Sequence, residues 1–127
     1  MTGQRIWELN LAGISTPAVA GDWIFTLTDE SKLLCIARST GKVRWLTELK
    51  RWDNPKKRTD PVFWTGPVLA GNRLWIANSE GRVYSADVNE GAVSQFVKLD
   101  DPVSLAPVVA GGTLYVLDDG GRISAFR

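Results

Sequence analysis

Apolar and polar residues alternate along three short segments of this chain, residues 23–28 (WIFTLT), 73–78 (RLWIAN) and 113–118 (TLYVLD). These segments are rich in β-branched and aromatic residues, which is typical of half-buried strands. Each is followed by a polar turn (DESK, SEGR or DGGR) and then by a second short run (LLCIA, VYSAD or ISAFR). The pattern therefore predicts three β-hairpins. We find no helical periodicity in the sequence, which predicts an all-β fold.

The three hairpins are copies of a longer repeat. When Gly21, Gly71 and Gly111 are aligned, the sixteen positions that follow match without a gap. The segments before these glycines (TPAVAG, GPVLAG and APVVAG) each contain a proline, which we expect at the start of a short strand, where a missing N–H is tolerated. An aromatic residue stands four positions after each glycine and is expected in the core; these residues are Phe25, Trp75 and Tyr115.

A second motif occurs before the first hairpin and again after the first and second hairpins. TGQRIW at residues 2–7 is repeated as TGKVRW at 40–45, and EGAVSQF at 90–96 is a weaker third copy. The segment 42–49 (KVRWLTEL) predicts a fourth strand. About 40 residues that form four short antiparallel strands make one blade of a β-propeller. The sequence therefore predicts a partial β-propeller, a single segment over residues 1–127 with about three four-stranded antiparallel blades.

The blades are expected at about residues 15–49, 64–99 and 105–127, the last completed by a strand like the one expected at about 4–11. Propellers typically close with four to eight blades. An arc of three blades would leave strand edges and apolar faces open, which favours association. We therefore expect self-association, in which the opening strand of one copy completes the final blade of another.

The spacing of glycine and tryptophan resembles that of the PQQ-like β-propeller repeat family. In that repeat a strand ends near an aspartate, a TG turn follows, and a tryptophan lies four residues after the glycine. The matching positions are Gly3 with Trp7, Gly41 with Trp45, and Asp87 four residues before Gly91. Ala37 departs from the aspartate position, and Gln95 stands where a third tryptophan would be.

Within this group the chain most resembles the C-terminal part of the BamB family, the propeller lipoproteins of the outer-membrane β-barrel assembly machinery. This resemblance implies a fragment of an eight-bladed propeller that acts as a non-enzymatic scaffold without a cofactor. It implies protein partners, namely the barrel-assembly complex, through the periplasmic repeat domains of its central protein, and unfolded outer-membrane proteins. It also implies a periplasmic location at the outer membrane, and no partner-contacting residue is carried over from the family.

The same repeat family leaves a different function open. The propeller of PQQ-dependent dehydrogenases holds the quinone and a calcium ion near its central axis, and that family implies a catalytic aspartate, metal ligands and usually a disulfide between adjacent cysteines. This chain has one cysteine, Cys35, and no histidine, so it can form no internal disulfide and lacks the commonest general base. A fragment of such a dehydrogenase is the alternative, but we assign no catalytic, cofactor-binding or metal-binding residue.

Basic charge is concentrated in residues 50–64 (KRWDNPKKRTDPVFW). This stretch holds five of the 15 basic and two of the 14 acidic side chains, whereas the whole chain has a net charge of +1. A nucleic-acid-binding protein usually has a broader basic surface, so we expect no nucleic-acid partner. Pro55 and Pro61 are expected to interrupt regular strand pairing, which predicts an enlarged loop between two blades.

This loop has two interpretations, a solvated connector or a contact site for an acidic or peptide partner. Loops on a rigid scaffold often carry function, and Trp and Arg are enriched among the residues that anchor interfaces. The possible partner-contact residues are Arg51, Trp52, Lys56, Lys57 and Arg58.

The other conspicuous residues are expected to be structural. Trp7 and Trp45 recur at one register and should pack between blades, while Gly21, Gly71 and Gly111 mark a repeated turn. The DDGG sequence at 118–121 aligns with the turns of the other hairpins, one of which contains Asp29 and Glu30, so it predicts a turn rather than a calcium loop.

Cys35 aligns with the small residues Ser85 and Ala125, which indicates packing rather than a nucleophile. The sequence has no run of about 18 apolar residues that would predict a transmembrane helix. Met1 leads directly into polar TGQR, so we expect no signal peptide in this chain.

Overall fold

The computed structural model describes residues 2–11 and 15–127. These residues contain thirteen strands and no helix. The strands are β1 (Ala18–Ala20), β2 (Trp23–Leu27), β3 (Lys32–Ala37), β4 (Val43–Glu48), β5 (Trp52–Asn54), β6 (Thr59–Pro61), β7 (Trp64–Ala70), β8 (Arg73–Asn78), β9 (Arg82–Asp87), β10 (Val93–Lys98), β11 (Val108–Ala110), β12 (Thr113–Leu117) and β13 (Ile123–Phe126).

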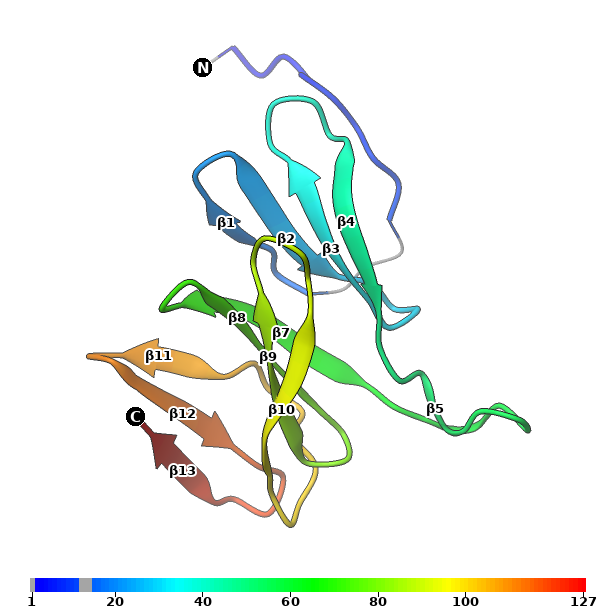
Figure 1. The fold of residues 1–127 in the computed structure, drawn as a ribbon, viewed down its shortest axis with the longest axis vertical. Coiled ribbons are helices and arrows are strands. Elements are labelled where there is room, and N and C mark those ends of the chain that lie inside the picture. The colour runs from blue at the N-terminus through cyan, green and yellow to red at the C-terminus, as the bar shows by residue number, and fades with distance from the viewer. Residues whose placement is uncertain (1, 12–14) are drawn as a thin grey trace.

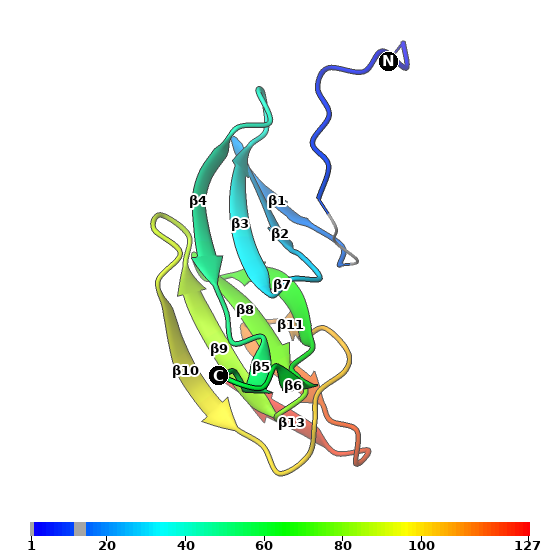
Figure 2. The ribbon, with the colours of Figure 1, turned by 90° about the vertical axis from the view of Figure 1, so that its right-hand side faces the viewer.

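Three antiparallel sheets follow one another along the chain (Figures 1 and 2). The first sheet has the order β1-β2-β3-β4, the second β7-β8-β9-β10 and the third β11-β12-β13, while β5 and β6 form a separate hairpin. Strand β7 contacts β1, β2 and β11, so the first strands of the three sheets converge. This arrangement of two four-stranded sheets and one three-stranded sheet, each antiparallel, confirms the predicted all-β, blade-like fold.

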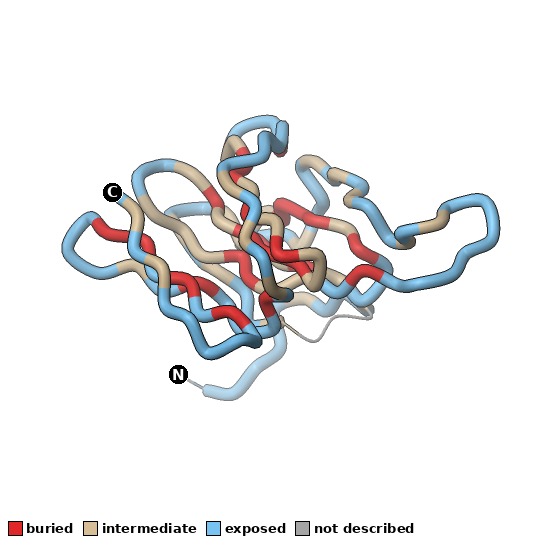
Figure 3. The backbone as a smooth tube through the Cα atoms, turned by 90° about the horizontal axis from the view of Figure 1, so that it is seen from below, coloured by how far each residue is buried: buried red, intermediate tan, exposed pale blue. Residues whose placement is uncertain are grey.

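The hydrophobic core lies between the sheets. One cluster joins the first and second sheets through Phe25, Leu33, Leu74 and Ile76. A second cluster joins the second and third sheets through Val83, Val103, Leu114 and Val116, among others. Side chains alternate along a strand, so the second sheet presents Leu74 and Ile76 to one neighbour and Ala77 to the other. Figure 3 shows the buried positions gathered toward the middle of the molecule and the exposed positions along its outer turns.

The three aromatic residues predicted for the core have different environments. Phe25 is 2% exposed, and Trp75 is half-buried against the second cluster, but Tyr115 is 39% exposed. These residues share a register in which the side chain faces the following sheet. The prediction is wrong for Tyr115 because no sheet follows the third one among the described residues.

Two predicted local features are also corrected by the structure. Residues 2–11 form no strand, because no other described strand lies alongside them to supply backbone hydrogen bonds. Pro67 does not begin its strand but lies within β7, at a register shift between Thr65 and Val68. A proline is tolerated there because the pairing is already interrupted.

Candidate protein-interaction site

The basic stretch 50–64 forms a projecting hairpin rather than an irregular loop (Figure 1). Strands β5 and β6 pair Trp52 with Pro61, and the Val62 N–H donates to the Arg51 carbonyl at 2.9 Å. Hydrogen-bonded and non-hydrogen-bonded pairs alternate in an antiparallel ladder, so Pro61 occupies a position where no N–H is required. The expectation that the prolines would prevent pairing is therefore wrong.

The base of the hairpin is fixed to the second sheet. Lys50 Nζ lies 3.1 Å from Asp53 Oδ1 and 3.1 Å from Glu80 Oε2, and Trp64 Nε1 donates to the Lys50 carbonyl at 2.8 Å. Hydrogen bonds to Glu80 and then Asp53 raise the pKa of Lys50, while the hydrogen bond from Lys50 lowers the pKa of Asp53. Val62, at the end of the hairpin, is only 5% exposed, so the hairpin leaves the sheet from an ordered base.

The five predicted partner-contact residues lie on this hairpin or directly before it. The Arg51 guanidinium lies 5.4 Å from the centre of the half-buried Trp52 ring, within the range of a cation–π interaction. Lys56, Lys57 and Arg58 are exposed at the tip, and no salt bridge involves them within the described part of the chain. The hairpin thus combines an aromatic side chain at its base with unneutralised positive charge at its end.

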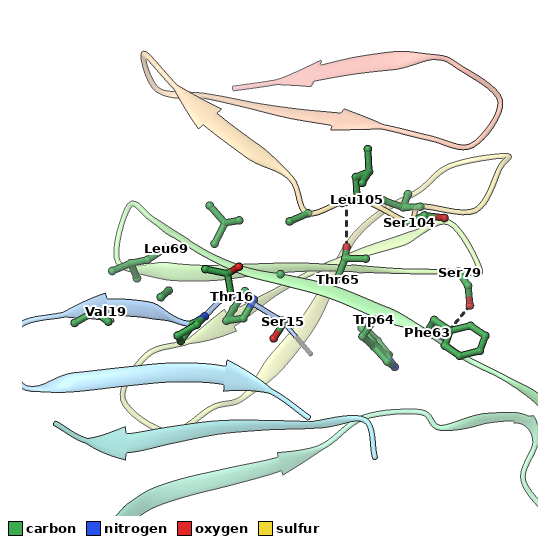
Figure 4. Close-up of a pocket in the computed structure, with 17 residues that line it drawn as sticks. Ser15, Thr16, Val19, Phe63, Trp64, Thr65, Leu69, Ser79, Ser104 and Leu105 are labelled. Carbon is green, nitrogen blue, oxygen red and sulfur yellow. Dashed lines mark hydrogen bonds between the residues drawn. The ribbon is translucent and has the colours of Figure 1, made fainter. Parts of the chain in front are cut away.

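A groove of about 830 Å³ lies along β1 and β7 and was not anticipated from the sequence (Figure 4). Its lining comes from three separate segments, 15–19, 63–69 and 103–106, together with Ser79. Phe63, 65% exposed, is among the lining residues. Two hydrogen bonds cross between the segments: the Phe63 N–H donates to Ser79 Oγ at 3.0 Å, and Thr65 Oγ1 donates to the Leu105 carbonyl at 3.2 Å.

The lining of this groove contains hydroxyl groups and apolar side chains but no ionisable side chain. It can therefore offer van der Waals contacts and hydrogen bonds to a ligand, but no acid or base for a reaction. The PAVAG-like segments, which form the first strand of each repeat, were the feature of the sequence that could have indicated this surface. Their meeting in space depends on how the sheets pack.

The repeated tryptophans bridge consecutive parts of the fold. Trp7 Nε1 donates to the Arg38 carbonyl at 2.6 Å, and Trp45 Nε1 donates to the Val88 carbonyl at 3.0 Å. The rings lie against Gly41 and Gly91, so that a Cβ atom at either glycine would collide with the ring. Both glycines have a positive φ, +76° and +75°, which favours glycine in any case. Trp45 therefore links the first sheet to the second, and Trp7 links the N-terminal segment to the first.

The remaining predicted positions lie in turns or in the core. Gly21, Gly71 and Gly111 have φ values between +56° and +59° and lie in the turns β1–β2, β7–β8 and β11–β12. Asp29 and Glu30 lie in the turn after β2, and 118–121 lies in the turn after β12. Cys35 is fully buried in β3, and burial raises the pKa of its thiol.

Residues 2–11 and 15–127 contain no group of three or more His, Cys, Asp or Glu side chains placed to hold a metal ion. None of their elements is a helix long and apolar enough to cross a membrane.

Known proteins resemble this chain over its whole length. The family model described as "Outer membrane protein assembly factor BamB" matches residues 1–55 and 50–127. A protein of that name from Alkalilimnicola ehrlichii is 26% identical over 126 residues, which cover 98% of this chain and 30% of the relative. The protein of that name from Salmonella typhimurium is 26% identical over 127 residues, again 98% of this chain and 30% of the relative. The chain thus spans about a third of the length of such relatives.

Solved structures share the fold. The crystal structure of BamB from Moraxella catarrhalis has a TM-score of 0.69 at 20% identity, covering 95% of this chain and 36% of that one. A quinohemoprotein alcohol dehydrogenase from Pseudomonas putida has a TM-score of 0.74 at 18% identity, covering 94% of this chain and 20% of that one. At these identities the structural likeness concerns the fold alone.

Proposed function

Because this chain belongs to the family of the outer membrane protein assembly factor BamB, we propose that it is a non-enzymatic, protein-binding part of a propeller that serves outer-membrane β-barrel assembly. The observation that carries the proposal is the family match across the whole chain. We further propose a periplasmic location at the outer membrane, with the barrel-assembly complex and unfolded outer-membrane proteins as partners.

The β5–β6 hairpin is our proposed contact site. Its ordered base holds Arg51 and Trp52 in place through Lys50 and Val62, so little conformational entropy is lost there on binding. Its tip carries Lys56, Lys57 and Arg58, which are exposed and available to an acidic partner surface. Charge at the rim of an interface increases the association rate and makes binding sensitive to salt.

Binding of the chain to a detergent-solubilised barrel-assembly complex tests this proposal. We expect the immobilised chain to retain the complex, and the triple variant Lys56→Gln, Lys57→Gln, Arg58→Gln to retain it about tenfold less well at low salt. The control variant Arg38→Gln, Lys42→Gln, Lys98→Gln removes the same charge from exposed positions outside the hairpin and should bind normally. Equal losses in the two variants would refute the hairpin as the contact site, and no retention of the complex would refute the proposed partner.

The alternative function, a fragment of a PQQ-dependent dehydrogenase, has support only from the shared fold. It predicts that the chain binds the quinone together with calcium. Titration of the chain with both ligands distinguishes the two functions, because binding would shift the absorbance of the quinone. We expect no shift.

A further inference from the structure

The groove along β1 and β7 is elongated. Its lining on β7 and directly before it runs from Phe63 to Leu69, which at about 3.3 Å per residue of a strand corresponds to roughly 20 Å. Figure 4 shows Phe63 toward one end of the groove, and Val19 and Leu69 toward the other. A site of this length fits an extended chain of several residues better than a compact small molecule.

The groove is centred on the inner strand of the middle sheet. β7 has β1 on one side and β11 on the other, and every lining residue belongs to 15–19, 63–69, 103–106 or is Ser79. Further blades of a larger propeller would be added beyond the first and third sheets, so β7 would keep the same two neighbours. The groove is therefore expected in a larger propeller as well.

Two strands direct backbone groups toward this groove. β1 and β7 lie at the edges of their sheets and pair only with β2 and β8 in the described structure. Each is joined to its partner by a two-residue turn, and the pair that closes such a turn is hydrogen-bonded. Since hydrogen-bonded and non-hydrogen-bonded pairs alternate, the N–H and C=O groups of Val19 and Leu69, one residue further on, point away from β2 and β8. Such edge groups can bind the main chain of an extended peptide.

The side chains of the groove favour an uncharged ligand with apolar groups. Phe63, Leu105 and Val19 are 65%, 61% and 55% exposed, and all three belong to the lining. Apolar side chains that gather in an open groove are typical of a binding site. The lining has no ionisable side chain, so a charge placed in the groove would find no partner there.

The basic tip of the β5–β6 hairpin continues from one end of the groove. Arg58 precedes Phe63 by five residues, which corresponds to roughly 15 Å of strand. Lys56, Lys57 and Arg58 are exposed and form no salt bridge within the described residues. An extended chain that leaves the groove beside the hairpin would therefore reach three positive charges after about five residues.

We propose that the groove and the hairpin together bind one extended segment of polypeptide. Its bound part is an uncharged stretch of about six residues with apolar side chains, flanked by acidic residues. The uncharged stretch lies along β7 against Phe63, and the acidic residues contact the hairpin tip. The proposal rests on the function proposed above, in which the hairpin contacts an acidic partner, and it assigns that contact to an unfolded segment.

Titration of the full chain with labelled peptides tests the two-part site. The probe has the uncharged sequence TVTLTV between two acidic DED ends, so it can bind in either chain direction. Fluorescence anisotropy at low salt should show binding. Replacing TVTLTV by GSGSGS, or both DED ends by QNQ, should weaken binding at least about tenfold. Equal affinities for the three peptides, or no binding of the probe, would refute the proposal.

Matched variants of the chain assign the peptide to the groove. Phe63→Ser removes an exposed ring from the lining and should weaken binding of the probe about tenfold. Val43→Ser changes an apolar residue that is also exposed, on β4 and outside the groove, and should leave binding unchanged. Both positions are exposed, so both variants should keep the circular dichroism spectrum of the unmodified chain. Equal binding by the two variants would overturn the proposal.

A photoreactive peptide provides a measurement on the unmodified chain. With a benzophenone side chain at the centre of its uncharged stretch, the probe should attach within 15–19, 63–69 or 103–106, as read by mass spectrometry. Attachment elsewhere would overturn the proposal. Retention of the barrel-assembly complex without peptide binding would refute the groove and leave the proposed function intact. Peptide binding without retention of the complex would support the groove and refute the proposed partner.

Discussion

At the scale of single residues, Trp45 and Trp52 have similar chemistry but different surroundings. Trp45 packs on Gly91, lies 6.1 Å from the Phe25 ring centre and hydrogen-bonds across two sheets. We expect Trp45→Ala to lower the free energy of unfolding by about 3 kcal/mol. Trp52→Ala, in the projecting hairpin, should cost only about 0.5 kcal/mol. Urea unfolding followed by circular dichroism measures both values, and equal losses would contradict the role assigned to Trp45.

The glycine beside Trp45 allows a matched test. Gly91 and Gly111 both have a positive φ, but a Cβ atom would collide with Trp45 at Gly91 and would meet open space at Gly111. Gly111→Ala should therefore cost only the strain of the left-handed conformation, about 1 kcal/mol. Gly91→Ala should cost at least about 2 kcal/mol more, because the ring must move. Thermal unfolding of the two variants checks the difference; similar melting temperatures would mean that the ring has space to shift.

The ion pairs of Lys50 make the hairpin base sensitive to pH. Lys50 lowers the pKa of Asp53. The ion pair therefore stabilises the hairpin base fully above the ordinary carboxyl pKa of about 3.9, and this stabilisation is lost as the pH falls through the lowered pKa of Asp53. Lys50→Met should raise the pKa of Asp53 toward its ordinary value. An NMR titration of the side-chain carboxyl carbon measures this, with Lys42→Met as the control. An unchanged Asp53 titration would mean that the pair does not persist in solution.

At the scale of elements, the β5–β6 hairpin should be separable from the sheets. Arg51 and Val62 form a hydrogen-bonded pair, which is the geometry that a two-residue Asn-Gly turn closes. Replacing residues 52–61 by Asn-Gly should preserve the β-sheet circular dichroism spectrum and lower the melting temperature by less than about 5 °C. Loss of the spectrum would show that the hairpin is part of the core.

Limited proteolysis provides an independent measurement on the unmodified chain. Trypsin should cut first after Lys56, Lys57 or Arg58, because exposed loop tips are the preferred sites of proteolysis. Lys50 is held by two carboxylates and should be cut later. Early cleavage within β3 or β8 would contradict this assignment.

The sequence allowed the elements to be predicted more completely than the surfaces between them. The hairpins and the strand around Trp45 were visible because their alternation and turn residues are local. The pairing of β5 with β6 was not predicted, because whether Pro61 breaks a ladder depends on which pairs are hydrogen-bonded. The groove was not predicted either, because Val19, Phe63 and Leu105 are distant in sequence and meet only when the sheets pack.

At the scale of the whole molecule, stability and association should be linked. If another copy covers the exposed face of the third sheet, which includes Leu117 and Ile123, the folded state gains free energy in proportion to the logarithm of protein concentration. We expect the melting temperature to rise by several degrees over a hundredfold increase in concentration. A concentration-independent melting temperature would contradict association through this face.

The contact between a tryptophan ring and a distant glycine also has an evolutionary consequence. Trp7 with Gly41 and Trp45 with Gly91 are each separated by roughly one repeat. A duplicated repeat therefore supplies both a tryptophan ring and a glycine against which the ring of a neighbouring repeat can pack. Whole blades can thus be gained or lost without a new kind of contact between blades. Across homologous sequences, the two positions of each pair should change together, with a residue that tolerates a positive φ, such as asparagine, accepted at the glycine where the tryptophan has become small.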